Sequence, residues 1–247
     1  MQQYQPFKME HAIRTYETGS DGRLIPAHLI HVLQHTAGKH ADELGWSVRT
    51  LHENNQSWVL QRFYVKITQL PNDGETLYIT TYPSGADRIF AYRDYIVKDS
   101  KGAEVARATS SWVILDFSSR RAVAIPESVK EITKQFGERL LELPKTRLQS
   151  ITNETPVDTF KVRRHDLDLN RHVNNVKYIE WMLESVPEET FYNQTPLEID
   201  IVFKAECFPG DIVASRLEDK DGEFLHTLYL EGNEKEVCLG RTVWGKV

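Results

Sequence analysis

Apolar positions along the chain predict two successive units, each built from one helix and several strands. In the first half, Leu29, Leu33 and Ala37 recur at helical spacing between residues 26 and 44, which predicts a helix with one buried face. Segments rich in aromatic and β-branched residues then predict strands, and the turn residues between them favour antiparallel neighbours. The first predicted strand, at residues 7–18, precedes the helix, and the others are residues 58–69, 75–82, 88–98 and 104–117.

The second half repeats this order in a shorter form. A strand is predicted at residues 159–164, followed by a helix at residues 171–185 that Pro187 ends. Further strands are predicted at residues 197–207, 211–218, 224–232 and 236–246.

Matching spacings indicate that the two halves are copies of one unit. Lys66 precedes Pro71 by five positions, and Lys204 precedes Pro209 by the same interval. An eight-residue spacing from Glu to Trp also occurs twice, at Glu104 and Trp112 and at Glu236 and Trp244. We therefore predict an α+β protein with domains at residues 1–148 and 149–247, each with a long helix packed on an antiparallel sheet.

Composition and charge narrow the class of protein. The chain has 247 residues, of which 40% are hydrophobic and 27% charged, so it can bury a sizeable core. Its net charge of −6 is opposite to that of a general nucleic-acid binder, and no apolar run reaches the roughly 20 residues of a membrane span. Two cysteines are too few for a disulfide framework. A soluble, cytoplasmic protein without nucleic-acid or membrane partners is expected.

One polar segment, at the start of the predicted helix of the second half, combines side chains that catalysis uses. Asp168, Asn170 and His172 alternate there, and His172 shares helical spacing with Val176 and Ile179. The segment would place a carboxylate, an amide and an imidazole beside the N–H groups of a helix N-terminus, which can polarise a carbonyl group. Each residue alone is more often a helix cap or a core residue. Their joint occurrence favours a catalytic site.

These residues resemble the signature of the acyl-ACP thioesterases. The motif reads Asp168-Leu-Asn170-Arg-His172-Val-Asn-Asn, and a second motif, Phe-Lys-Ala-Glu206-Cys207, closes a strand downstream. The resemblance implies two tandem hotdog domains, hydrolysis of fatty acyl-ACP to free fatty acid, and no metal or cofactor. It also implies Asp168, Asn170, His172 and Glu206 as the catalytic set. No plastid transit peptide precedes the first predicted strand, which favours a bacterial-type cytoplasmic protein.

Side-chain alternation along the strand predicted at residues 197–207 separates Glu206 from Cys207. In a regular strand, Cys207 falls on the apolar face with Ile199 and Ile201, whereas Glu206 falls on the opposite face. A cysteine on an apolar face is usually an inert core residue. We therefore expect Glu206 to be the general base or the nucleophile, and Cys207 to be its neighbour.

The first half lacks these polar groups. No Asp-x-Asn-x-His pattern precedes its helix, and the spacing match places Thr68 at the position of Glu206. A copy without catalytic groups is free to form a binding cavity, so we expect the first domain to hold the acyl chain, with Leu29 and Leu33 among its contacts. Each buried CH₂ contributes about 0.8 kcal/mol, so pocket depth would set the preferred chain length.

Three residues of the second half are expected to bind substrate. Asn174 belongs to the helix motif, and Arg163 and Arg164 form a basic pair beside it in an otherwise acidic protein. A solvated surface would explain the arginines equally well. Their functional interpretation is docking of an acidic acyl carrier protein that carries a fatty acyl-phosphopantetheine.

Other interpretations stay open at the level of the sequence. An acyl-CoA thioesterase would catalyse the same hydrolysis on an acyl group carried by coenzyme A. A non-catalytic acyl-binding protein would share the fold. His28, His31 and His35 recur on one helix face, but few carboxylates lie near them, so a solvated surface is favoured over a metal site. Exposed strand edges in such folds would allow a homodimer.

Overall fold

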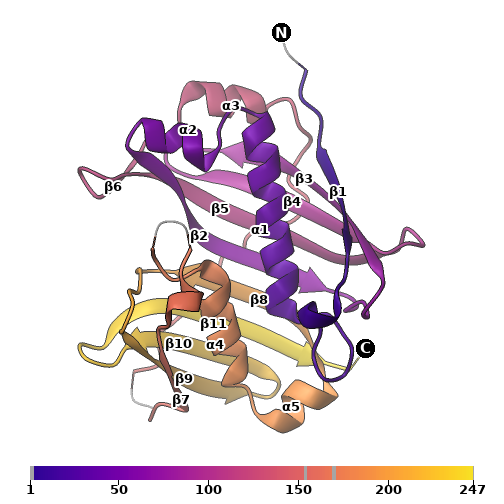
Figure 1. Ribbon diagram of the computed structural model, residues 1–247, viewed down its shortest axis with the longest axis vertical. Coiled ribbons are helices and arrows are strands. Elements are labelled where there is room, and N and C mark those ends of the chain that lie inside the picture. Colours follow the sequence, from indigo (N-terminus) through magenta and orange to yellow (C-terminus); the bar gives the residue numbers. More distant parts are fainter. Residues whose placement is uncertain (1–2, 153–154, 169–170, 247) are drawn as a thin grey trace. The chain divides into compact units, whose positions relative to one another are not determined.

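The computed structural model describes residues 3–152, 155–168 and 171–246. The chain forms two compact units. The first unit comprises Met1–Leu143 and the second comprises Pro144–Val247. In each unit a helix packs on an antiparallel sheet (Figure 1), so the predicted α+β class is confirmed. Within the described ranges, no helix is both long and apolar enough to cross a membrane.

The sheet of the first unit has the strand order β1-β3-β4-β5-β2, and β6 pairs with β5. Its pairings are antiparallel. The strands are β1 (Phe7–Ala12), β2 (Gln56–Ile67), β3 (Thr76–Ala86), β4 (Ala91–Lys98), β5 (Glu104–Asp116) and β6 (Arg121–Val123). The helices are the 3-10 turn η1 (Thr15–Glu17), α1 (Pro26–Glu43), α2 (Val48–Glu53) and α3 (Glu127–Thr133).

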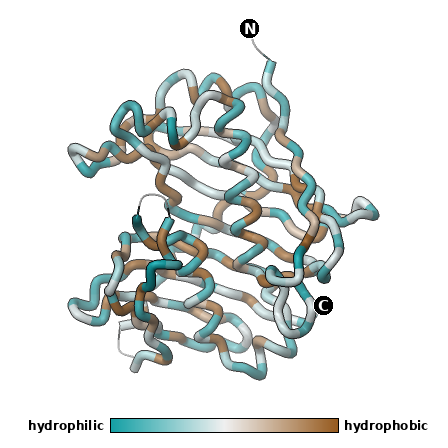
Figure 2. The backbone as a smooth tube through the Cα atoms, in the orientation of Figure 1, coloured by the Kyte–Doolittle hydropathy of each residue, from teal (hydrophilic) through white to brown (hydrophobic). Residues whose placement is uncertain are grey.

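Helix α1 matches the helix predicted at residues 26–44. It begins at Pro26, whose fixed φ suits the first turn of a helix. Leu29, Leu33 and Ala37 are buried, and the helix packs against β1 and β3 across one face of the sheet (Figure 1). Figure 2 shows how apolar and polar residues alternate along it, as an amphipathic helix requires.

The sheet of the second unit has the strand order β8-β11-β10-β9-β7, again antiparallel. Its strands are β7 (Asp158–Lys161), β8 (Thr195–Phe203), β9 (Ile212–Lys220), β10 (Glu223–Leu230) and β11 (Lys235–Gly245). Its helices are the 3-10 turn η2 (Arg164–Asp166), α4 (Asn175–Glu184) and α5 (Glu188–Asn193).

Helix α4 approaches its sheet closely at Gly240 of β11. A Cβ atom at this position would lie 2.0 Å from Sδ of Met182 and 3.4 Å from Cβ of His226. Met182 is fully buried, so its side chain fills the space that the missing Cβ leaves. Glycine is required here by the close packing of helix on sheet.

The predicted helix at residues 171–185 is too long at its N-terminus. Helix α4 begins at Asn175, because the side-chain oxygen of Asn174 caps it by accepting a hydrogen bond of 3.0 Å from the Val176 N–H. Arg171 has a left-handed φ of 62°, and Leu167 forms an isolated antiparallel bridge with Val173. His172 therefore precedes the helix instead of opening its buried stripe.

The predicted strand at residues 197–207 is too long at its C-terminus. Strand β8 ends at Phe203, and the N–H groups of Lys204 and Ala205 both donate to the carbonyl oxygen of Val237, at 2.9 and 3.3 Å. Two donors on one acceptor break the regular alternation of the strand, as in a β-bulge. Side-chain directions beyond Phe203 thus follow from this irregular segment and not from strand periodicity.

Candidate active site

His172 and Glu206 meet in the second unit. Nδ1 of His172 lies 3.2 Å from Oε1 of Glu206, and the two side chains are 27% and 29% exposed. His172 comes from the loop before α4, and Glu206 from the irregular segment after β8. The pair is thus partly shielded from water and still reachable from outside.

Backbone hydrogen bonds fix the two segments beside each other. The Val173 N–H donates to the carbonyl oxygen of Cys207 at 3.2 Å, which joins the residue after His172 to the residue after Glu206. Asp168 holds the other side of the loop. Its N–H donates to the carbonyl oxygen of His172 at 2.8 Å, and its Oδ1 accepts from the His172 N–H at 3.3 Å. The predicted Asp168 therefore contacts the main chain of His172.

Cys207 directly follows Glu206 and has no exposed surface. Its N–H donates to the hydroxyl oxygen of Tyr178 at 3.0 Å, and that hydroxyl donates to the carbonyl oxygen of Ala205 at 3.4 Å. Burial raises the pKa of the Cys207 thiol to about 11, so the thiol is protonated at neutral pH. Glu206 and Cys207 point to different surroundings, as expected, although the irregular segment and not strand alternation separates them.

Of two further predicted residues of the motif, the structure describes only one. Asn170 lies outside the residues that the structure describes. Asn174 is described, and its side-chain oxygen is engaged in capping α4. A role of Asn174 in binding substrate stays a prediction.

Two N–H groups at the N-terminus of α4, where the sequence predicted donors to a thioester oxygen, are already engaged. The Val176 N–H is bonded to the side chain of Asn174, and the Lys177 N–H donates to the Asn174 carbonyl oxygen at 2.9 Å. These two donors are therefore used by the cap and the first turn of the helix. Binding of the thioester oxygen at this helix N-terminus stays a prediction.

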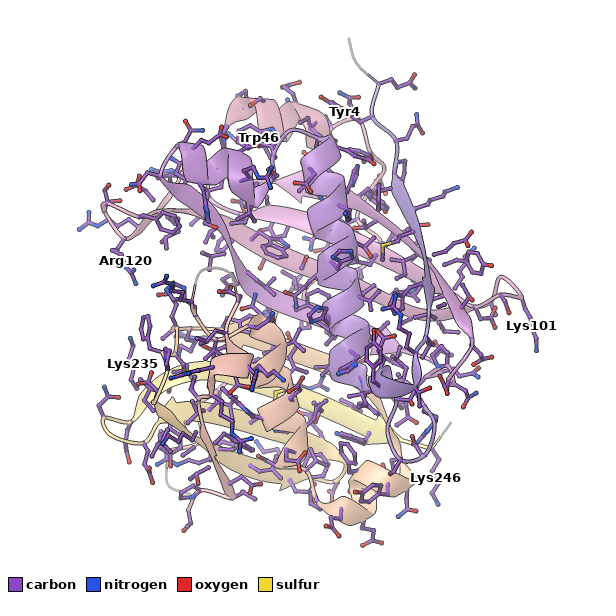
Figure 3. All side chains as sticks on the ribbon, viewed as in Figure 1. Tyr4, Trp46, Lys101, Arg120, Lys235 and Lys246 are labelled. Atoms are coloured by element: carbon purple, nitrogen blue, oxygen red, sulfur yellow. The ribbon has the colours of Figure 1, made fainter. Side chains whose placement is uncertain are left out.

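The predicted basic pair lies on the surface beside this loop. Arg163 and Arg164 are exposed, and the Arg163 N–H donates to Oδ2 of Asp166 at 2.7 Å. The Asp166 carbonyl oxygen accepts from the Asn174 N–H at 2.7 Å, which ties η2 to the start of α4. Other exposed cations of this unit include Lys235 at the start of β11 (Figure 3).

The first unit repeats the backbone of this loop without its aspartate and histidine. The Gly19 N–H donates to the Arg23 carbonyl oxygen at 2.9 Å, as Asp168 does to His172. Gly22 donates to Gly19 at 3.0 Å, as Arg171 does to Asp168 at 3.1 Å. Gly19 and Arg23 thus occupy the positions of Asp168 and His172.

The residue that corresponds to Glu206 is Leu70, and the predicted Thr68 is wrong. The carbonyl oxygen of Val105 accepts from Thr68 and Gln69, just as that of Val237 accepts from Lys204 and Ala205. Counting two residues beyond Thr68 and Lys204 pairs Leu70 with Glu206. The spacing match of the sequence was displaced by two positions. Leu70 is buried and apolar, so the first unit still lacks the carboxylate.

Two family sequence patterns together match most of this chain. The sequence pattern of the acyl-ACP thioesterase N-terminal domain matches residues 4–133, and that of the C-terminal domain matches residues 149–246. The chain belongs to the acyl-ACP thioesterase family. It is therefore a thioester hydrolase with two hotdog domains, and the resemblance drawn from its motifs is confirmed.

Individual family members are similar over nearly the whole chain. A chloroplastic oleoyl-acyl carrier protein thioesterase of Arabidopsis thaliana is 31% identical over 97% of this chain and 76% of its own. The structure of an acyl-ACP thioesterase from Bacteroides thetaiotaomicron superposes with a TM-score of 0.89 at 25% identity, covering 96% of this chain and 97% of that one. The 12:0-ACP thioesterase from Umbellularia californica shares the fold, with a TM-score of 0.86, 24% identity and 97% coverage of both chains.

The sequence did not reveal two aromatic residues of the site. Tyr178 anchors the segment that carries Glu206, and Phe208 packs against His172 with ring centroids 5.3 Å apart. Tyr178 stands within the family motif, but neither its spacing nor its residue type signalled a contact with the segment of Glu206. Phe208 had a usable signal, because a phenylalanine directly before Pro209-Gly210 is an unusual turn residue.

Proposed function

We propose that this thioesterase hydrolyses fatty acyl-ACP to free fatty acid and ends chain elongation, with the pair of His172 and Glu206 as its chemical centre. The observation that carries the proposal is the 3.2 Å contact between Nδ1 of His172 and Oε1 of Glu206 at a partly exposed position. A general base must be ionised and then only accepts hydrogen bonds, so in this proposal Nδ1 of His172 carries the proton that faces Oε1 and orients the carboxylate.

In the proposed reaction, Glu206 acts as general base on water. The water oxygen attacks the thioester carbonyl carbon while Glu206 accepts a proton from it. The new C–O bond forms, the C–S bond breaks, and the proton passes to the phosphopantetheine sulfur. Asp168 keeps the His172 main chain in place through its carboxylate. Asn170 is assigned to the thioester oxygen on the strength of the family motif alone.

A thiol-release assay on acyl-ACP and acyl-CoA substrates of several chain lengths tests this function. Faster turnover of acyl-ACP than of the matching acyl-CoA supports acyl carrier protein as the carrier of the substrate, whereas the reverse order supports an acyl-CoA thioesterase. Asp168→Ala is the control with reduced activity, because it removes the carboxylate that holds the main chain of His172. Absence of thiol release from every substrate would assign the chain to acyl binding without catalysis.

We also propose that Arg163 and Arg164 receive the acidic carrier protein. Both side chains are exposed. Arg163 directly precedes η2 and Arg164 is its first residue, and a hydrogen bond ties η2 to the loop of His172. Reversing their charge in an Arg163→Glu, Arg164→Glu variant should raise KM for acyl-ACP at low salt and leave turnover of acyl-CoA unchanged, because charged rims mainly affect association. An equal loss with both substrates would contradict a docking role.

The first unit is proposed to hold the acyl chain. The first unit has Gly19 and Leu70 where the second unit has Asp168 and Glu206. It therefore lacks the proposed catalytic carboxylates and is free to bind the acyl chain. Leu29 and Leu33 are fully buried on α1 and are the proposed contacts. A Leu29→Met exchange conserves volume and should shift the preferred chain length while the protein stays folded. An unchanged chain-length profile would remove Leu29 from the acyl site.

The cytosol is the proposed compartment. Cys207 and Cys238 are both free and buried, which suits a reducing environment. Localisation of a tagged full-length chain in its native cell would test this directly.

A further inference from the structure

Phe208 presents an exposed aromatic ring to the side of the proposed catalytic pair. Its side chain is 46% exposed, and its ring meets the imidazole of His172 edge to face, with centroids 5.3 Å apart and planes at 88°. The backbone beneath the ring is fixed by a tight turn. The Phe208 N–H donates to Oδ2 of Asp211 at 2.8 Å, and the Asp211 N–H donates back to the Phe208 carbonyl oxygen at 3.1 Å.

The first unit contains the same turn with a different residue. The Asn72 N–H donates to Oε2 of Glu75 at 2.6 Å, and the Glu75 N–H donates to the Asn72 carbonyl oxygen at 3.2 Å. Asn72 also forms an isolated antiparallel bridge with Arg23, the counterpart of His172. Its side-chain amide turns back onto Glu75 at 3.2 Å. The fold therefore builds this turn, and pairs it with the loop, without an aromatic residue.

This internal comparison separates what the turn requires from what the site contains. An asparagine satisfies the turn, so turn geometry does not explain an exposed phenylalanine at position 208. Its distinguishing contact is the one with His172, whose Nδ1 lies 3.2 Å from Oε1 of Glu206. The torsion that rotates an imidazole has a broad energy profile, so the ring needs neighbours to hold its orientation.

We infer that Phe208 is a positioning residue: its ring fixes the imidazole of His172 in the orientation that directs Nδ1 at Glu206. The inference rests on the proposed roles of His172 and Glu206. Aromatic rings prefer the edge-to-face arrangement seen here, and the position is rigid because the turn holds its backbone. Small misplacements of a catalytic group reduce turnover strongly, so loss of the ring should act on kcat.

Kinetics of three variants of the full chain test the inference with acyl-ACP as substrate. Phe208→Asn, which installs the residue of the first unit, should lower kcat about tenfold and leave KM within about twofold. Phe208→Leu should fall as far, because a leucine gives no edge-to-face contact, and Phe208→Tyr should recover most of the activity. A rise in KM with unchanged kcat would instead place Phe208 in substrate binding and overturn the inference.

A direct readout of the imidazole accompanies the kinetics. The proton NMR signals of the His172 ring should shift in Phe208→Asn, because they lose the ring current of Phe208, and should stay close to wild type in Phe208→Tyr. Unchanged signals would show that the rings do not meet in solution and would contradict the inference.

The control variant is Tyr192→Asn on α5. Tyr192 is 58% exposed and meets Phe191 at 5.5 Å and 84°, so it matches Phe208 in exposure and ring geometry but lies outside the site. It should retain wild-type kcat. Glu206→Gln separates the two levels of failure. If it loses turnover while Phe208→Asn does not, the inference fails and the proposed function stands; if it retains turnover, the proposed catalytic pair itself is wrong.

Discussion

Single residues explain most differences between the two copies of the loop. Where the first unit has Gly19 and Leu70, the second has Asp168 and Glu206, although the backbone hydrogen bonds are the same. Catalytic chemistry thus required changes of side chain on a conserved backbone framework. One such change works against stability, because Arg171 occupies a left-handed conformation that its counterpart Gly22 adopts without strain.

Arg171→Gly should leave the protein as stable or more stable. The φ of 62° costs a non-glycine residue about 1–2 kcal/mol, and the extra freedom of an unfolded glycine offsets about 0.5–1 kcal/mol of the gain. Urea denaturation should therefore show an increase in unfolding free energy of up to about 1 kcal/mol. The matched variant Gly22→Ala, at a φ of 76°, should lose stability. A clear loss in Arg171→Gly would mean that the arginine side chain itself stabilises the loop.

At the scale of elements, the long amphipathic helix was predictable and the ends of the catalytic elements were not. Helix α1 (Pro26–Glu43) has five turns of consistent apolar spacing, so its limits agree with the predicted 26–44. His172 fits the apolar spacing of α4 by coincidence, whereas the start of that helix is decided by the cap at Asn174. Periodicity does not encode a cap or a bulge, and both lie beside the site.

The bulge after β8 had the same effect on the internal comparison. Two N–H groups share the Val237 carbonyl oxygen, and the equivalent arrangement at Val105 follows β2. The spacing of lysine to proline does not register these irregularities, so it paired Thr68 with Glu206. Hydrogen bonds identify Leu70 instead. The catalytic residue types were recognisable from the motif, but their geometry depended on these irregular segments.

Gly240→Ala should destabilise the second unit. The new Cβ would lie 2.0 Å from Sδ of the fully buried Met182, so either that side chain or the helix must move. Overpacking of this kind costs about 1–3 kcal/mol, which thermal unfolding would detect as a lower Tm. Gly38→Ala, in α1 with open space around it, is the control and should raise the Tm, because alanine favours a helix interior. Equal effects of both substitutions would contradict the close packing at Gly240.

At the scale of the whole molecule, each unit contains one buried histidine that folding keeps neutral. His40 in the first unit accepts a hydrogen bond of 3.0 Å from Nη1 of Arg93, and burial lowers its pKa to about 4. His226 in the second unit lies 2.9 Å from Oγ1 of Thr242, and burial lowers its pKa to about 3. Both values lie well below the ordinary 6.5.

The stability of the chain should therefore fall between pH 7 and pH 5. The unfolded chain protonates these histidines below about pH 6.5, whereas the folded protein keeps them neutral until the pH approaches their lowered pKa values. The unfolded state binds more protons in this window, so each histidine should cost about 2 kcal/mol of unfolding free energy at pH 5. Denaturation curves at both pH values check this. In His226→Gln the pH dependence should shrink to about half, whatever the stability at pH 7; an unchanged dependence would contradict the assignment.

The division of roles between Glu206 and Cys207 is the central claim, and single-turnover hydrolysis of acyl-ACP by two matched variants tests it most directly. Glu206→Gln keeps the shape of the side chain and removes its basicity, so turnover should fall by about 10²- to 10⁴-fold. Cys207→Ala removes a buried thiol whose pKa of about 11 keeps it protonated, so turnover should stay within a few-fold of wild type. If Cys207→Ala abolished hydrolysis and Glu206→Gln retained it, the account of this active site would be wrong.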